Sequence, residues 1–353
     1  MRLKTNMLKH FFLLIFMALL LSSCFRSGYA DLVVKAPFIK LPQEKLGDSV
    51  RTYSLDIDRK NIQELYALGN SFASLKNKVN LKGFKEVSKS PDVMISMYVG
   101  TGYFYDKGMK TSTRMDKNGI PFDVYQRELA YSNLVSYRIY RPDSSLLDEV
   151  IVVNRDKRET YQSSSFKTIK ECDEWWFKNG NTEVNEIKSS LIKSGFEAIN
   201  TEINQHFGFL EATSSVDFRI IKDENHRDFK KFYSNNKIVK AAFNQLKSDN
   251  TEKYRKKIQP AIEFWIKKLP EYNESDESFI RYACLFNISM AYYWMDDFEH
   301  SKNYAALLIA EETNEVEANR VYDLIERTER QALKLGLPGT HFQVPESWKK
   351  RKK

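Results

Sequence analysis

Residues 287–301 read NISMAYYWMDDFEHS and contain the clearest structural pattern in the chain. Apolar side chains at helical spacing run from 279 to 294 and predict one helix. Asp296 and Asp297 then form a turn, and a second helix is predicted over 298–309. The stretch therefore predicts two consecutive helices joined by a very short connection.

The chain on both sides of this stretch is also predicted to be helical. Apolar faces with helical spacing occur within 238–246, 262–269 and 316–335. Gly336 and Pro338 end the last of these helices. An almost wholly helical C-terminal region is expected from Asn225 onward, within a second domain that starts near residue 211.

Residues 287–301 resemble a tetratricopeptide repeat where it crosses from its first helix to its second. Ile288 and Ser289 occupy the Leu-Gly positions of that repeat, and Tyr292 occupies its aromatic position. Ser301 stands where a small residue lets the two helices touch. The resemblance implies a short stack of helical repeats, with a plain helical bundle as the alternative.

The N-terminal part of the chain mixes strand and helix patterns. Residues 93–99 alternate between two faces with a period of two, as expected for a strand. Residues 135–139 and 150–153 flank a turn and predict a hairpin, and 182–207 predicts a long helix. The fold class is therefore α+β: a mostly antiparallel sheet with covering helices, followed by an all-α domain that resembles tetratricopeptide repeats.

The first residues predict a secretion signal and a lipid anchor. A basic segment precedes the apolar run 11–21, which is too short to cross about 30 Å of hydrocarbon as a helix. The sequence Leu-Ser-Ser-Cys at 21–24 follows and resembles a bacterial lipobox. The resemblance implies acylation of Cys24 with palmitate-type chains, which anchor a protein firmly to a membrane. An ordinary secretory signal cleaved near Ala30 is the alternative.

Phe25 stands where an aspartate would resemble the inner-membrane retention signal of Gram-negative lipoproteins. By that resemblance, the expected location is the periplasmic face of the outer membrane. No later stretch has the approximately 18 consecutive apolar residues that a membrane span requires. Four segments are therefore expected: a signal peptide, an α+β domain, a repeat-like helical domain and a basic tail, over 1–23, 24–210, 211–340 and 341–353.

The net charge of +8 is concentrated at the two ends of the chain. Arg2, Lys4 and Lys9 lie in the expected signal peptide, and the last five residues are all basic, so the charges of the remaining body cancel. A nucleic-acid-binding domain needs a basic surface, and a neutral body excludes that class. The run 349–353 is either a solvated tail or a segment that binds anionic lipid or phosphorylated glycan.

Motifs for catalysis or metal binding are absent from the sequence. It has no phosphate-binding loop, no Gly-x-Ser-x-Gly elbow and no His-Glu-x-x-His pair. Its five histidines are scattered and it has no Cys-x-x-Cys, so neither a metal nor another cofactor is expected. The protein is therefore expected not to be an enzyme. Cys172 and Cys284 are expected to be two buried free thiols, with a disulfide as the alternative.

The chain as a whole resembles a family of Gram-negative envelope lipoproteins of unknown function that have a tetratricopeptide-like C-terminal region. The lipobox, the hairpin sequence at 137–143 and the helical repeat provide this resemblance. It implies a lipid-anchored scaffold that recruits a protein partner through its helical repeats, and it supplies no catalytic residues.

Two aromatic clusters are candidate binding surfaces. Exposed members of the helical region would anchor a protein partner, with Tyr293, Trp294 and Tyr304 as the main candidates and Tyr292 beside them. In the alternative function, the N-terminal domain binds a glycan or a lipid. Trp175 and Trp176 would then stack on sugar rings, beside acidic side chains that accept hydrogen bonds from sugar hydroxyls.

Overall fold

The computed structural model describes residues 29–342 apart from 48, 59–60, 62, 64, 67, 70, 274–276 and 312–313. These residues form two compact units. We call residues 41–210 the sheet unit, and residues 29–40 together with 211–342 the helical unit. The expected signal peptide, Cys24 and the basic run at 349–353 lie outside the described residues. No helix among the described residues is long and apolar enough to cross a membrane.

A five-stranded sheet forms the centre of the sheet unit. Its strands are β2 (Thr52–Ile57), β3 (Lys85–Glu86), β4 (Val93–Val99), β7 (Val135–Tyr140) and β8 (Leu146–Val153), in the order β3-β2-β4-β7-β8. Strand β2 runs parallel to both β3 and β4, and the other pairs are antiparallel. The parallel pairs need a crossover, which contains the short helix α3 (Phe72–Lys76). The predicted hairpin is confirmed, with Val135 opposite Val153.

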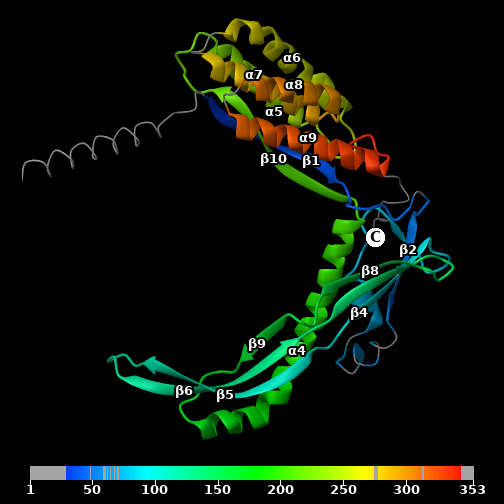
Figure 1. The fold of residues 1–353 in the computed structure, drawn as a ribbon, viewed down its shortest axis with the longest axis vertical. Helices are drawn as coiled ribbons and strands as arrows, with labels where there is room; N and C mark the ends of the chain where they lie inside the picture. Colours follow the sequence, from blue (N-terminus) through cyan, green and yellow to red (C-terminus); the bar gives the residue numbers. More distant parts are fainter. Residues whose placement is uncertain are drawn as a thin grey trace, which may run out of the picture. The chain divides into compact units, whose positions relative to one another are not determined.

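A second sheet consists of β5 (Tyr103–Met115), β6 (Pro121–Ser132) and β9 (Arg158–Gln162), all paired antiparallel. The hairpin of β5 and β6 continues away from the five-stranded sheet as a long arm (Figure 1). A bulge lies between Asp106 and Gly108, where Gly108 has a φ of 84°. This arm was not predicted from the sequence. Polar side chains lie on both faces of β5, so the alternation of apolar and polar residues that indicates a strand is missing.

Helix α4 (Ile169–His206) extends along both sheets of the sheet unit (Figure 1). It begins 13 residues before the expected start at 182, at a capping box in which Thr168 and Glu171 bond each other's backbone. Its apolar face buries Phe196 and Ile199 against the sheet. Helix α4 approaches the sheet most closely at Gly195, because a Cβ there would come within 2.5 Å of a methyl group of Val99 on β4.

The helical unit contains five α-helices and one 3-10 helix among the described residues. They are α5 (Phe229–Phe243), α6 (Glu252–Lys268), η1 (Leu269–Tyr272), α7 (Ser278–Tyr293), α8 (Phe298–Ala310) and α9 (Glu315–Leu335). Helix α7 is buried around most of its circumference. Ser289 and Ser301 donate hydrogen bonds to each other's carbonyl oxygens, at 2.9 and 2.8 Å, which holds α7 against α8. The two helices predicted on either side of Asp296 are confirmed.

The helical unit also contains a two-stranded sheet of β1 (Tyr29–Lys40) and β10 (Leu210–Ile221). Alternate residues of β1, including Leu32, Val34 and Ala36, are buried. The expectation that residues 29–40 belong to the first domain and that the helical region is all-α is therefore corrected. The pairing of β1 with β10 joins residues about 180 positions apart, a contact that local sequence patterns do not encode.

The segment after α9 is fixed to the helical unit by Asp296. One carboxylate oxygen accepts hydrogen bonds from the backbone N–H and the hydroxyl of Thr340, at 2.8 and 3.0 Å. The other accepts the backbone N–H of His341 at 2.9 Å and lies 3.1 Å from its Nδ1. His341 and Phe342 are buried, which corrects the expectation that the tail begins at 341.

Cys172 and Cys284 are free, buried and located in different units, as the buried-thiol interpretation expects. Burial raises the pKa of both thiols. We therefore predict that neither reacts with a thiol reagent in the native protein, and that both react after denaturation. Peptide mapping of the labelled protein by mass spectrometry checks this, and native labelling of either cysteine would contradict the burial.

Candidate functional sites

The tryptophan pair expected to bind sugars lies in the first turns of α4. The Trp175 ring packs against Phe166, with ring centroids 5.5 Å apart. Trp176 lies over Gly180 of its own helix, where a Cβ would come within 2.8 Å of the indole. Both tryptophans are half-buried, whereas the neighbouring Phe177 is 94% exposed. The pair therefore does not form a single open platform, because each ring uses part of its surface for packing within the sheet unit.

Tyr293 and Trp294 were expected to be exposed anchors and are instead buried, at 7% and 5% exposure. The Tyr293 hydroxyl lies 3.2 Å from the hydroxyl of Thr328 on α9. The Trp294 ring packs edge-on against Phe38 of β1 and against His341. This corrects their assignment: the end of α7 is surrounded on several sides, so these rings belong to the core of the helical unit.

A half-buried stack of three rings lies on one side of the α7–α8 pair. We call Tyr292, His300 and Tyr304 the ring stack. The Tyr292 ring is stacked on His300 with centroids 5.0 Å apart and on Tyr304 with centroids 5.9 Å apart. The His300 side chain is 56% exposed, and its Nδ1 lies 2.8 Å from a carboxylate oxygen of Asp297. Of the three main candidates only Tyr304 is partly exposed, and Tyr292, named beside them, is half-buried in the same way.

One neighbouring side chain and the burial of its two phenols influence the chemistry of the ring stack. Leu307, one helical turn beyond Tyr304 on α8, is 48% exposed and extends the apolar surface. Burial, followed by the Coulombic effect of Tyr304, raises the pKa of Tyr292. Burial also raises the pKa of Tyr304, so both phenols remain neutral donors at physiological pH. The stack therefore offers aromatic faces together with uncharged hydroxyl groups.

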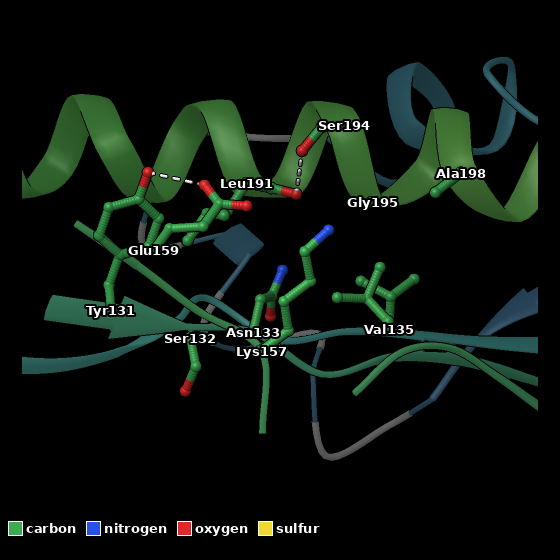
Figure 2. Close-up of a pocket in the computed structure, with 11 residues that line it drawn as sticks. Tyr131, Ser132, Asn133, Val135, Lys157, Glu159, Leu191, Ser194, Gly195 and Ala198 are labelled. Carbon is green, nitrogen blue, oxygen red and sulfur yellow. Dashed lines mark hydrogen bonds between the residues drawn. The ribbon is translucent and has the colours of Figure 1, made fainter. Parts of the chain in front are cut away.

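A pocket of about 170 Å³ lies between α4 and the ends of the strands in the sheet unit (Figure 2). Strand β6 contributes Tyr131, the connection from β6 to β7 contributes Asn133, and the segment around the start of β9 contributes Lys157 and Glu159. Helix α4 closes the pocket with an apolar surface that includes Leu191. Typical binding pockets measure about 300–1,000 Å³, so this one is smaller than a typical ligand site.

The polar groups of this pocket come from segments that are distant in sequence. The Tyr131 hydroxyl donates a 2.9 Å hydrogen bond to Glu159. Asn133 is only 5% exposed, and its side-chain oxygen accepts the Leu134 N–H at 2.8 Å. Sequence reasoning missed all of these residues, because single polar residues in separate segments have no recognisable spacing.

A second pocket, of about 260 Å³, lies on the opposite face of the five-stranded sheet. Ser96, Ser136 and Arg138 line it and alternate along their strands with buried core residues. Arg138 is paired with Glu149 at 2.8 Å, and Arg155 lies over the ring of Tyr103 at 4.3 Å from its centroid. Both arginines therefore already have partners within the sheet unit. Among the described residues no group of three or more potential ligands could hold a metal ion.

Comparison with known proteins identifies no family for this chain. No family model matches it, and no curated protein matches it. A crystal structure of a minor lipoprotein from Acinetobacter baumannii is among the solved structures found; it is 11% identical, covers 46% of this chain and 96% of its own, and gives a TM-score of 0.20. A likeness with that TM-score carries no argument about fold or function.

Proposed function

We propose that this protein is a lipid-anchored binding protein of the bacterial envelope that recruits a protein partner through its helical unit. The lipobox-like sequence ending at Cys24 supports the anchor, and Phe25 supports the outer membrane as its location. The ring stack supports the α7–α8 side of the helical unit as the surface that recruits the partner. It is the observation on which the proposed binding function rests.

The ring stack has the physical properties of a binding anchor. Tyrosine is enriched among the residues that dominate binding energy at interfaces, because it combines a large apolar area with a hydroxyl group. Stacking on Tyr292 restricts the rotamers of Tyr304 before a partner arrives, which lowers the entropic cost of binding. The serine contacts between α7 and α8 hold the two helices that present the rings. A partner would therefore meet a preorganised surface.

The glycan-binding alternative through Trp175 and Trp176 has less support. Trp175 uses one side for Phe166, and Trp176 uses one face for its own helix. A sugar platform needs an open aromatic face beside polar groups. The ring stack is the better supported surface, since its rings are stacked with one another and remain half exposed at the helix pair.

The proposal predicts that Tyr304→Ala weakens capture of the partner by tenfold or more, because truncating an interface anchor typically costs more than about 1.4 kcal/mol. The measurement is crosslinking in intact cells followed by affinity capture. Tyr233→Ala is the matched control: Tyr233 lies on α5 of the same unit, is 55% exposed and also stacks on a neighbouring ring, Phe229. Thermal unfolding establishes that both variants are folded.

The control variant is expected to capture the partner as the unchanged protein does. If folded Tyr304→Ala protein captures the partner normally, the ring stack is not the recruiting surface. Equal losses in the two variants would also contradict the proposal, because they would show no preference for the α7–α8 side.

A further inference from the structure

We propose that the end of the helical unit at Tyr29 faces the membrane, because the lipid anchor at Cys24 attaches that end to the bilayer surface. This inference rests on the lipid anchor of the proposed function and adds the part of the molecule that lies at the membrane. Two observations carry it: the contacts that fix the first described residues, and the length of chain between them and Cys24.

The first residues of β1 are packed into the helical unit. The Tyr29 ring is stacked on Tyr282 of α7, with ring centroids 6.2 Å apart and an angle of 13° between the ring planes. The Arg219 guanidinium of β10 lies 5.1 Å from the ring centroid of Tyr29 and 4.6 Å from that of Phe286. Arg219 therefore makes cation–π contacts with a ring at the start of β1 and with a ring of α7.

Ion pairs fix the same end of β1 to α9. The Arg219 side chain is only 11% exposed, and it pairs with Asp31 of β1 and with Glu317 of α9. The Tyr282 hydroxyl donates a 2.7 Å hydrogen bond to Glu317. Because the guanidinium is largely buried, salt screens these pairs less than it screens surface pairs. We call the residues at this end of the unit the anchor-end cluster: Tyr29, Asp31, Arg219, Tyr282, Phe286 and Glu317.

Only a short stretch of chain separates this cluster from the acylated cysteine. Tyr29 is the fifth residue after Cys24, and five residues span at most about 18 Å when fully extended. Strand β1 alone has 12 residues, which extend over roughly 40 Å at about 3.3 Å per residue. The connection is therefore less than half as long as β1. Acyl chains inserted at Cys24 hold the chain at the bilayer, so Tyr29 stays near its surface.

Helix α9 provides a scale for testing this orientation. It begins at Glu315, close to the anchor-end cluster, because Glu317 in its first turn pairs with Arg219. Val316 in the first turn and Leu333 in the last turn are both exposed, at 63% and 71%. These two positions are 17 residues apart, or about 25 Å along the helix axis. Val316 should therefore lie closer to the bilayer than Leu333.

The test is energy transfer from a fluorophore on the full-length acylated protein to an acceptor lipid in phosphatidylcholine vesicles. Val316→Cys and Leu333→Cys proteins are labelled with the same thiol reagent, for which the buried Cys172 and Cys284 do not compete. Phosphatidylcholine has no net charge, so the acyl chains rather than the basic run at 349–353 hold the protein to the vesicles. Transfer from 316 is expected to be roughly twofold that from 333 or more, because the 333 label lies about 25 Å farther from the anchored end.

Flotation with the vesicles, measured first, separates this inference from the proposed function. Protein that floats but shows equal transfer from the two positions, or stronger transfer from 333, would overturn the inference and leave the lipid anchor standing. Protein that does not float would contradict the lipid anchor, and the inference with it.

A lengthened connection tests whether the short chain causes the orientation. Inserting about 20 Gly/Ser residues between Gly28 and Tyr29 gives a flexible chain with an r.m.s. span of roughly 25–30 Å, so the difference between the two labels should largely disappear. The same residues added after Lys353 are the matched control and should leave the difference unchanged. A full difference that persists after the first insertion would overturn the inference, as would an equal fall in the control.

Discussion

Replacing Asp228 by alanine is expected to lower the free energy of unfolding of the helical unit by about 3–5 kcal/mol, because it breaks a buried ion pair. The Asp228 side chain is 4% exposed and lies 2.9 Å from the ammonium group of Lys268, which is itself 8% exposed. The Tyr272 hydroxyl donates a 2.6 Å hydrogen bond to the same carboxylate. Without Asp228 the buried ammonium would lose one partner and the buried hydroxyl would lose its acceptor. Denaturant unfolding measures the loss.

Lys231 provides the control for this prediction. Its ammonium group also lies 2.9 Å from Asp228, but its side chain is 65% exposed. Lys231→Ala should therefore cost no more than about 1 kcal/mol, as exposed ion pairs do. Equal losses in the free energy of unfolding for the two substitutions would contradict the claim that Asp228 stabilises the protein because its contacts with Lys268 and Tyr272 are buried.

The contacts of Asp228 also make the free energy of unfolding depend on pH. Burial opposes ionisation of Asp228, but hydrogen bonds from Tyr272, Lys231 and Lys268 outweigh it and hold the pKa of the carboxyl below its usual range. A lowered folded-state pKa stabilises the protein above the unfolded pKa of about 3.9, and this stabilisation is lost as pH falls toward the folded value. The difference in stability between the unchanged protein and Asp228→Ala should accordingly shrink below about pH 4.

Asp296→Ala is expected to lower the free energy of unfolding of the helical unit by about 2–4 kcal/mol. This is the second largest effect that we predict for a single substitution. The substitution removes the carboxylate that accepts the backbone N–H groups of Thr340 and His341 and leaves these N–H groups without partners. The contact of His341 Nε2 with the carbonyl oxygen of Pro37, at 3.1 Å, remains. Asp296 also has a φ of 59°, a left-handed conformation that alanine adopts less readily than aspartate or asparagine. Thermal and denaturant unfolding check the prediction.

Asp296→Asn separates these contributions. Asparagine tolerates the left-handed backbone and keeps one acceptor oxygen, so it should cost clearly less than alanine. If alanine leaves the stability within about 0.5 kcal/mol of the original, the range of ordinary surface substitutions, then Asp296 does not hold the segment after α9 in place.

The parts of the fold that could be predicted are those whose sequence patterns lie within a few neighbouring residues. The apolar period up to Trp294, interrupted by Asp296 and Asp297, identified α7 and α8 because a helix and its end are encoded within a few turns. The hairpin of β7 and β8 was predicted for the same reason, since alternation and a turn occur in adjacent residues. The arm of β5 and β6 was missed because its polar residues do not alternate with core residues.

Site prediction failed where the surroundings of a residue decide its role. Tyr293 and Trp294 have the composition of binding anchors, but their burial depends on β1 and α9, which contact them from distant parts of the chain. Tyr304 has a similar sequence context and remains at the surface. The pocket residues Asn133 and Lys157 gave no sequence signal, since only folding of α4 over the strands brings them to one cavity.

The most direct test of the central claim is site-specific photo-crosslinking in intact cells. A photoreactive amino acid placed at position 304 contacts whatever binds the ring stack, and one placed at position 233 samples another exposed surface of the same helical unit. The account predicts one discrete crosslinked protein from position 304, absent from position 233 and lost when Tyr292→Ala is added to the chain. Crosslinks that are equal from both positions, or absent from 304, would contradict recruitment of a partner by this surface.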